Sequence, residues 1–274
     1  MLRNNTQNFI VNYLLYPFTV PGRYTISFIL EMGRVGCFLF QGILHIFSFP
    51  IQVSKIIQQI YFIGMKSMFV ICLTGIFTGM VLGLQGYYTL SKFGAEGLLG
   101  SAVALSLVRE LGPVLTAIMV IGRAGSAMAA EIGVMRISEQ IDALDTMDIN
   151  PIRFMVSPRI AASLISFPLL TAIFILLGIW GGYLTGSLLL GLSEGIYYSR
   201  VESGIVINDI IGGGIKSIVF SIVVVSICCF QGYYTHIRRE GHGARGVSFS
   251  TTSAVVISCV LVLISDYILT SFLL

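Results

Sequence analysis

Three long stretches of this chain carry almost no charge, and this feature restricts the possible folds more than any other. The only charged residue is Lys66 between residues 56 and 86, Arg159 between residues 154 and 193, and Asp266 between residues 247 and 274. Each stretch is longer than the about 20 apolar residues that a helix needs to cross a hydrocarbon core. A soluble helix exposes polar residues at helical spacing, which would interrupt such runs. The sequence therefore predicts an all-α integral membrane protein.

The same pattern divides the chain into a short N-terminal segment, residues 1–55, and a transmembrane domain, residues 56–274. We expect five membrane-spanning helices in this domain, over residues 60–86, 98–130, 154–192, 205–234 and 250–273. In the N-terminal segment, residues 24–49 have a helical pattern with Glu31, Arg34 and His45 among apolar residues. Such a mixture favours a helix that lies in the membrane interface over one that crosses it.

Lys and Arg residues predict the orientation of the spans. They gather before the first span, around the polar segment 131–153 and in the basic turn 236–245. Five spans place these three groups on one side, whereas the other side holds Lys92 and Arg200, with Lys216 just inside the fourth span. Because cytoplasmic loops carry the excess of Lys and Arg, we expect a cytoplasmic N-terminus and an external C-terminus. No transit-peptide pattern begins the chain, which favours a bacterial inner membrane over a plastid envelope.

No arrangement of reactive residues predicts an enzyme. The three histidines lie in separate regions, and the five cysteines have no zinc or disulfide spacing. Residues 212–217 do not have the spacing of a phosphate-binding loop and lie in an apolar span. The net charge of +3 is small and scattered, which does not suggest nucleic-acid binding. We expect no catalytic residue, metal or cofactor, and any ATP hydrolysis requires a separate subunit.

The segment between the second and third spans is the most polar part of the chain, and it predicts a short amphipathic helix on the cytoplasmic side. Ser138 suits the N-cap, acidic residues follow it, and Asn150-Pro151 would end the helix. Its acidic face would be repelled by an anionic lipid surface, which favours a protein partner. The predicted apolar face consists of Ile137, Ile141 and Leu144.

Arg109, Glu110 and Asp266 are charges inside predicted spans. Ionisable residues in a membrane span usually face the protein interior and are paired, so they are candidates for function. Arg109 and Glu110 are adjacent and point about 100° apart on a helix, so we expect each to have a partner on another span. Asp266 fits a functional charge and a solvated helix end equally well.

Two stripes of small residues suggest close helix contacts in the membrane. The first span holds Gly75, Gly79 and Gly83, and the third holds Gly178, Gly182 and Gly186. Such stripes allow close approach of two helices. Packing within one subunit is the simpler interpretation, and contact between subunits is the alternative.

Several ordered motifs resemble the MlaE-type permeases, the membrane subunits of Mla and Mce lipid transporters. The resemblance covers residues 60–274 and is carried by four stretches: ALSLVRELGPVLT at 104–116, GRAGSAMAAEIG at 122–133, EQIDAL at 139–144 and Asn150-Pro151. In the last span, the pair Thr251-Thr252 and the stretch DYILT at 266–270 are also similar to the family.

The resemblance implies a homodimer, two cytoplasmic ABC ATPase subunits, a periplasmic MCE-domain partner and phospholipid as substrate. It implies that Glu139 and Gln140 belong to the helix that couples the permease to its ATPase. With them we assign to the ATPase contact Glu131, Ile137, Ile141, Asp142 and Leu144. The resemblance also suggests that three residues at the end of the first span line a lipid pocket, namely Leu84, Gln85 and Tyr88.

Two other interpretations remain. The chain could be an ion-coupled secondary transporter that uses Arg109, Glu110 and Asp266 as an ion relay, although no inverted repeat is visible. It could also be a membrane enzyme that acts on lipid headgroups, although polar residues do not gather at one membrane face. The acidic loop helix favours the ABC permease.

Overall fold

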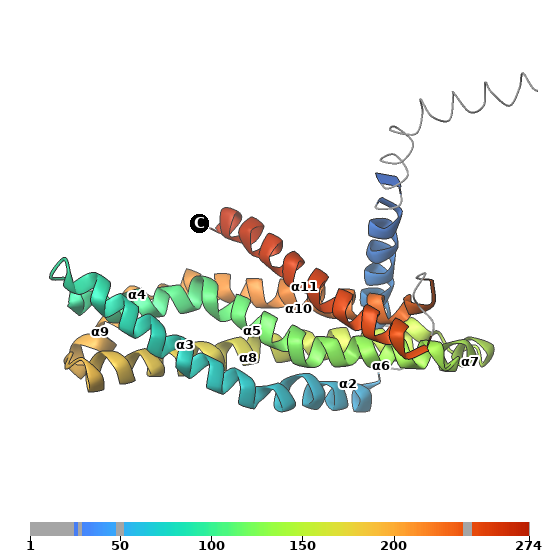
Figure 1. The fold of residues 1–274 in the computed structure, drawn as a ribbon, viewed down its shortest axis with the longest axis horizontal. Helices are drawn as coiled ribbons and strands as arrows, with labels where there is room; N and C mark the ends of the chain where they lie inside the picture. Colours follow the sequence, from blue (N-terminus) through green and yellow to red (C-terminus); the bar gives the residue numbers. More distant parts are fainter. Residues whose placement is uncertain (1–24, 27–28, 48–51, 238–242, 274) are drawn as a thin grey trace, which may run out of the picture.

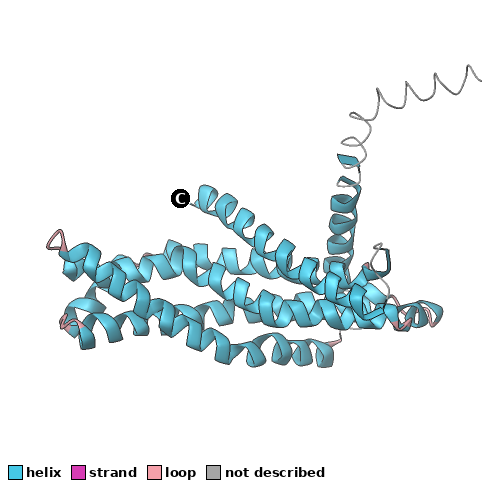
Figure 2. Ribbon diagram, in the orientation of Figure 1, coloured by secondary structure: helices cyan, strands magenta, loops and turns pink. Residues whose placement is uncertain are grey.

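Five long helical segments form the protein, and the computed structural model describes residues 25–26, 29–47, 52–237 and 243–273 (Figure 1). Within these ranges helices are connected by short loops and turns, and no β-strand occurs (Figure 2). The five segments that are long and apolar enough to cross a membrane are Val53–Ser91, Glu96–Ile137, Ile152–Leu189, Ile207–Tyr233 and Gly243–Leu273. The predictions of an all-α fold and of five spans are therefore confirmed.

The first, second and fifth segments are longer than the predicted ranges 60–86, 98–130 and 250–273, whereas the third agrees with its predicted range 154–192 to within three residues at each end. The first three segments contain 39, 42 and 38 residues, which at about 1.5 Å per residue gives lengths near 60 Å. This exceeds the thickness of a hydrocarbon core, which is about 30 Å. The predicted ends were too short where a helix continues through polar residues such as Lys55, Arg136 and Arg245, which lower the hydropathy.

The first three segments are not continuous α-helices, because π-helical turns interrupt them. The first consists of α2 (Val53–Ile60), a π segment over Tyr61–Met65 and α3 (Lys66–Ser91). The second contains a 3₁₀ turn over Glu96–Leu98, α4 (Leu99–Ser106), α5 (Gly112–Val120) and α6 (Ser126–Ile137), with π segments Leu107–Leu111 and Ile121–Gly125 between the last three. The third begins with a π segment over Ile152–Val156 and continues as α8 (Ser157–Tyr183) into another over Leu184–Leu189.

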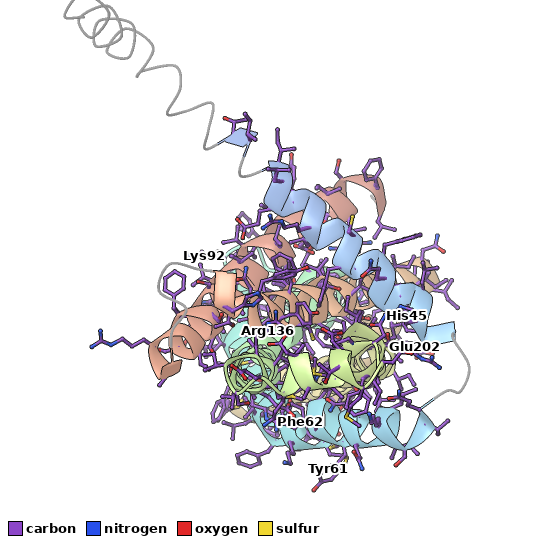
Figure 3. The ribbon with its side chains drawn as sticks, turned by 90° about the vertical axis from the view of Figure 1, so that its right-hand side faces the viewer. His45, Tyr61, Phe62, Lys92, Arg136 and Glu202 are labelled. Atoms are coloured by element: carbon purple, nitrogen blue, oxygen red, sulfur yellow. The ribbon has the colours of Figure 1, made fainter. Side chains whose placement is uncertain are left out.

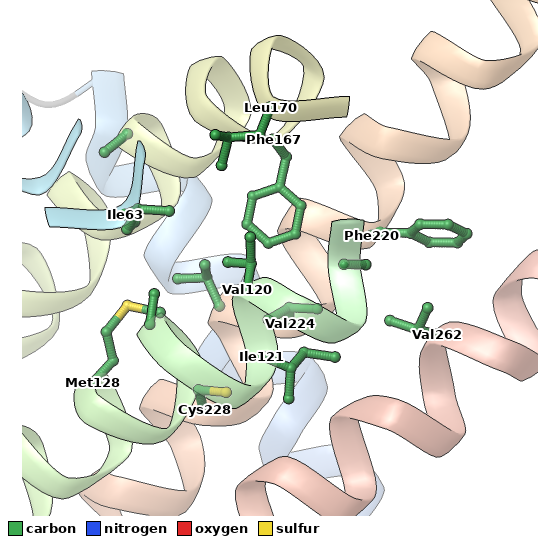
Figure 4. Packing of buried hydrophobic residues seen from close by; sticks show 14 of the residues in the cluster. Ile63, Val120, Ile121, Met128, Phe167, Leu170, Phe220, Val224, Cys228 and Val262 are labelled. Carbon is green, nitrogen blue, oxygen red and sulfur yellow. The ribbon is translucent and has the colours of Figure 1, made fainter. Parts of the chain in front are cut away.

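Shorter helices lie at the two ends of the bundle. The helix α7 (Gln140–Thr146) lies between the second and third segments at one end, and α9 (Glu194–Gly204) lies before α10 (Ile207–Tyr233) at the other (Figure 1). A 3₁₀ turn, Thr235–Ile237, follows α10, and α11 (Gly243–Leu273) forms the fifth segment. The core lies where α5, α8, α10 and α11 meet, and Figure 4 shows Val120, Phe167, Phe220, Val224 and Val262 there.

The N-terminal helix covers residues 29–44 and continues into a 3₁₀ turn, His45–Phe47. It runs across the long axis of the bundle near the α7 end (Figure 1). Phe38 anchors it, because this side chain is buried against Phe230 and Tyr233, with ring centroids 5.7 and 5.6 Å away. This direction suits a helix that lies along a membrane surface, which remains a prediction. Most of the predicted range before residue 29 lies outside the described residues.

The glycine stripes pack α3 directly against α8 within one subunit. A Cβ atom added to Gly79 would lie 1.8 Å from the Gly178 carbonyl oxygen, and one added to Gly83 would lie 3.0 Å from that of Gly182. Intrasubunit packing is therefore confirmed for these stripes. The exception is Gly186, which lies against the side chains of Leu99 and Tyr197 instead of α3.

Replacing Gly79 by valine is expected to cause loss of the folded protein, because the new side chain would collide with the backbone of α8. Overpacking at such a contact costs about 1–3 kcal/mol and more where backbone must move. Expression and the melting temperature in detergent measure this effect. The matched control is Gly122→Val in the second segment, where an added Cβ meets nothing within 4 Å. Equal behaviour of the two variants would contradict the prediction.

Candidate functional site

The intramembrane charges that the sequence singled out come together in one network between the second, fourth and fifth segments. Arg109 and Glu110 lie in the π segment Leu107–Leu111, and π turns of this kind occur frequently at functional sites. Arg109 Nε lies 2.8 Å from Asp209 Oδ1, whereas Glu110 Oε2 lies 2.7 Å from Lys216 Nζ. The prediction that these neighbours find separate partners on other spans is confirmed.

Lys216 is the centre of this network. Its residue is only 2% exposed, and its ammonium donates to Glu110 Oε2 at 2.7 Å, to the Arg109 carbonyl at 2.8 Å and to Thr270 Oγ1 at 2.7 Å. These bonds use all three N–H donors of a lysine. Asp266 Oδ1 lies 3.0 Å from the same nitrogen and accepts no hydrogen bond among the described residues. Asp266 is therefore held by charge attraction and is not a freely solvated helix end.

The network links three helices through one cation. Its formal charge is −1 when all five ionisable groups are charged, since two cations, Arg109 and Lys216, face three carboxylates. Removing one partner of a buried ion pair typically costs about 3–5 kcal/mol, because the other charge is left uncompensated. Lys216 therefore fixes the position of α10 relative to the second segment and α11.

A small cavity opens next to these charges. Its volume is about 40 Å³, and it is lined by Arg109, Glu110, Asn208, Asp209, Gly212, Gly213, Lys216, Thr270 and Leu273. A water molecule needs about 10–15 Å³ measured in this way. The cavity can thus hold one or a few waters beside the ion pairs but not a phospholipid.

Sequence reasoning missed two members of the network. The sequence placed Lys216 just inside the fourth span without giving it a role, and it did not single out Asp209. The signal that could have found them is electrostatic. A buried lysine or arginine in an apolar span needs a carboxylate on another span, and the described fourth and fifth segments each contain one carboxylate, at Asp209 and Asp266.

The predicted loop helix exists as α7, but it begins later than expected. Ser138 does not cap α7. It ends α6 instead, and its hydroxyl donates to the Val134 carbonyl at 2.8 Å. Glu139 takes the N-cap position in the left-handed conformation, with φ of 59°. The reason is that α6 continues to Ile137, so only Ser138 and Glu139 separate it from the start of α7.

The apolar face of α7 is covered by the subunit itself. Ile141 is fully buried, and Leu144 and Ile137 are half-buried, the last of them on α6. The prediction that this face enters a partner groove is therefore wrong for Ile141. The surface that α7 leaves exposed is acidic and polar, with one large apolar side chain next to it, Met147, which is 68% exposed. The other exposed residues of this surface include Glu139, Gln140, Asp142, Asp145 and Asp148.

Arg136 holds α7 in place, and sequence reasoning did not identify it. Its guanidinium lies 2.7 Å from Asp142 Oδ1, donates from Nε to His236 Nδ1 at 2.9 Å and lies over the Tyr233 ring, 5.4 Å from its centroid. Burial and the nearby Arg136 charge lower the pKa of His236, so the neutral ring can accept this hydrogen bond at pH 7. Figure 3 shows Arg136 near the centre of the bundle in a view from the α7 end.

Glu131 does not belong to the loop helix. It lies on α6, where its carboxylate is 2.8 Å from Arg159 Nη2 on α8. This pair joins the second and third segments, whereas α7 lies further along the chain. The structure therefore gives Glu131 a partner within the subunit, and its contact with an ATPase remains a prediction.

The candidate lipid-pocket residues lie on one exposed side of α3, near the end opposite α7. Leu84 and Tyr88 are 42% and 59% exposed, and Gln85 between them is also exposed. These side chains therefore face away from their own subunit. A pocket that contains them has to be completed by lipid or by another protein surface.

The chain has five segments that can span a membrane, a charge network between three of them and a short acidic helix after the second segment. These features define a multi-pass α-helical membrane protein. Residues 56–272 match the family model described as "Permease MlaE". The chain belongs to the MlaE permease family, and its homologues are permease subunits of ABC transporters.

Relatives agree with this assignment along almost the whole chain. The chain is 40% identical to the "Intermembrane phospholipid transport system permease protein MlaE" of Haemophilus influenzae, over 96% of this chain and 98% of that protein. It is 41% identical to a "Probable ABC transporter permease protein" of Rickettsia typhi, over 92% and 95% of the two chains. It is 37% identical to the chloroplastic protein TRIGALACTOSYLDIACYLGLYCEROL 1 of Arabidopsis thaliana, over 85% of this chain and 65% of that protein.

Proposed function

We propose that this chain is the membrane-spanning permease subunit of an ABC transporter that moves phospholipid between the bacterial inner membrane and a periplasmic MCE-domain partner. The observation that carries this proposal is its 40% identity over 96% of the chain to a permease named for intermembrane phospholipid transport. In this proposal a separate cytoplasmic ATPase supplies the energy, the N-terminus is cytoplasmic and the C-terminus is periplasmic.

The exposed surface of α7 is the proposed contact for the ATPase. Four acidic side chains in and next to this helix are exposed, namely Glu139, Asp142, Asp145 and Asp148. Arg136 fixes this helix to α6 and to the end of α10. A displacement of α7 by the ATPase would therefore also move these two spans. A rigid, acidic contact of this kind fits a partner with a basic or hydrogen-bond-donating groove.

The exposed side of α3 is the proposed wall of the lipid pocket. Leu84, Gln85 and Tyr88 would face the pocket, which a second copy of the chain would complete. The small cavity beside Lys216 is too small for this role. In this proposal the charge network fixes the relative positions of the spans. The lipid binds elsewhere, in the pocket between the two copies of the chain.

The charge network also keeps a second candidate function open, namely ion-coupled secondary transport. Arg109, Glu110 and Asp266 all belong to one network around Lys216, and a cavity large enough for water reaches it. This arrangement could take up and release a proton. The experiment that separates the two functions is to change the energy source.

Reconstitution of the permease with its ATPase in phospholipid vesicles tests the proposal. We expect transfer of a fluorescent phospholipid to an acceptor to require ATP and to stop with an ATPase that cannot hydrolyse it. A proton or sodium gradient alone should have no effect. Transfer that proceeds without ATP and follows the ion gradient would contradict the ABC permease and support the secondary transporter.

A further inference from the structure

The charge network between the second, fourth and fifth segments contains one more carboxylate than it has cations. Arg109 has its own acid in Asp209, at 2.8 Å, so Glu110 and Asp266 are left to share Lys216. The Lys216 ammonium lies 2.7 Å from Glu110 Oε2 and 3.0 Å from Asp266 Oδ1. No other ion pair reaches either acid within the described residues, so one negative charge has no counterpart.

This surplus charge lies between helices that are long and apolar enough to span a membrane. Glu110 lies in the π segment Leu107–Leu111, and Asp266 lies about two turns before the end of α11. Lys216, between them, is only 2% exposed. Charges inside a membrane span are normally paired, because an uncompensated charge is costly there. The network therefore lacks one positive charge next to Glu110 and Asp266.

Hydrogen-bond donors are also missing at these two acids. The three N–H groups of Lys216 go to Glu110, to the Arg109 carbonyl and to Thr270. The single hydroxyl hydrogen of Thr270 has two acceptors within reach, Glu110 Oε1 at 3.1 Å and the Asp266 carbonyl at 2.8 Å. Asp266 Oδ1 is buried and accepts no hydrogen bond among the described residues. An ionised carboxylate only accepts hydrogen bonds, so this pair of acids has too few donors.

A proton on one of the two carboxyls supplies both the missing charge and a missing donor. The side chains of Glu110 and Asp266 are close enough for a hydrogen bond to each other. Two ionised carboxylates cannot form such a bond, since neither has a hydrogen to donate. When one is protonated, its O–H donates to the other, which is how closely spaced carboxyls share a proton in other proteins. The five ionisable groups then carry no net charge.

A metal ion fits this place less well than a proton. The cavity of about 40 Å³ is lined by Glu110, Lys216 and Thr270 but not by Asp266. An ion in this cavity would contact Glu110 and would not reach the buried Asp266 oxygen. A proton needs no room of its own, and water in the cavity would bring it to Glu110.

We propose that Glu110 and Asp266 share one proton at neutral pH, so that the network around Lys216 is a proton-binding site without net charge. Lys216 then faces the single negative charge that the two carboxyls hold together, while Arg109 and Asp209 pair with each other. The inference goes beyond the proposed function, because it concerns the protonation of the resting protein. It holds whether ATP or an ion gradient drives transport.

Infrared spectroscopy of the purified full-length chain tests this proton, because the C=O stretch of a carboxylic acid is separate from the bands of an ionised carboxylate. The detergent must contain no ester group, and the shift of the band in D₂O identifies an exchangeable proton. We expect the wild-type chain to show this band at pH 7. Asp266→Asn and Glu110→Gln should each remove it, since the remaining carboxyl then pairs with Lys216 and ionises. A wild-type spectrum without the band, or a band that survives both substitutions, would overturn the proposal.

The matched control is Glu131→Gln, which neutralises an acid beside another buried cation, Arg159, at 2.8 Å. It should keep the band but lower the melting temperature in detergent, because Arg159 loses its only acid among the described residues. Asp266→Asn makes the same change beside Lys216 and should leave the melting temperature nearly unchanged, because an asparagine amide can donate to Glu110 as the protonated acid does.

A loss of stability in Asp266→Asn as large as that in Glu131→Gln would mean that Asp266 is ionised, and it would overturn the shared proton. A wild-type chain that lacks the band and is stabilised by sodium would overturn it too, in favour of a metal ion. Neither measurement involves ATP or lipid transfer, so their outcome is independent of the test of transport.

Discussion

Replacing Lys216 by methionine is expected to destabilise the protein strongly and to abolish transport. The substitution leaves Glu110 and Asp266 close together without their shared cation, because the Lys216 ammonium lies 2.7 and 3.0 Å from the two carboxylates. Leaving a buried charge unpaired costs about 3–5 kcal/mol. The melting temperature in detergent and the amount of folded protein in the membrane measure the first effect, and ATP-driven lipid transfer measures the second.

A combined variant separates stability from function. Lys216→Met together with Glu110→Gln and Asp266→Asn removes the three charges at once and should recover most of the lost stability. We expect this variant to remain inactive if the charges take part in transport. Full recovery of transport along with stability would mean that the network is only structural. Glu110→Ala alone should reduce transport more than protein level, since Lys216 keeps Asp266 as a partner.

Charge reversal on α7 is expected to separate the permease from its ATPase without unfolding it. Glu139→Lys and Asp145→Lys change exposed side chains that have no ion-pair partner among the described residues. If these acids meet basic groups in the complex, each reversal should cost at least about 2 kcal/mol, or roughly 30-fold in Kd. ATPase pull-down and the coupling of hydrolysis to lipid transfer measure the effect.

The matched control for α7 is Glu202→Lys, which makes the same charge change on α9 at the opposite end of the bundle. It should not alter ATPase association. Ile141→Asp is unsuitable as a test of the contact, because Ile141 is fully buried and the variant would unfold α7 from its own subunit. Normal association and coupling in both acidic variants would remove the coupling role from α7.

The sequence predicted the number of spans correctly because burial in lipid imposes long apolar runs that no other environment does. It predicted the first, second and fifth segments too short, since these helices continue through polar residues such as Lys55, Arg136 and Arg245, where hydropathy carries no signal. Ser138 was assigned to the wrong helix for a related reason. Its hydroxyl can cap the start of a helix or bond back to the end of one, and only the length of α6 decides between them.

The charge network illustrates a different limit. Arg109, Glu110 and Asp266 stand out in the sequence as isolated charges in apolar runs. Their partners become visible only in the structure, because helix packing brings them together. Asp209 lies 100 residues from Arg109, and Lys216 lies 106 residues from Glu110. The face of α7 was misjudged for the same reason, because an apolar face does not reveal whether its own chain or a partner covers it.

The glycine contacts between α3 and α8 restrict how this permease can change shape. The Gly79 Cα faces the Gly178 carbonyl, and Gly83 faces Gly182, so the two backbones touch at successive turns. Sliding one helix along the other by a residue would put larger side chains at these points. We therefore expect α3 and α8 to move together as one rigid unit. A path for lipid would then open between this pair and its neighbours and not between the two helices.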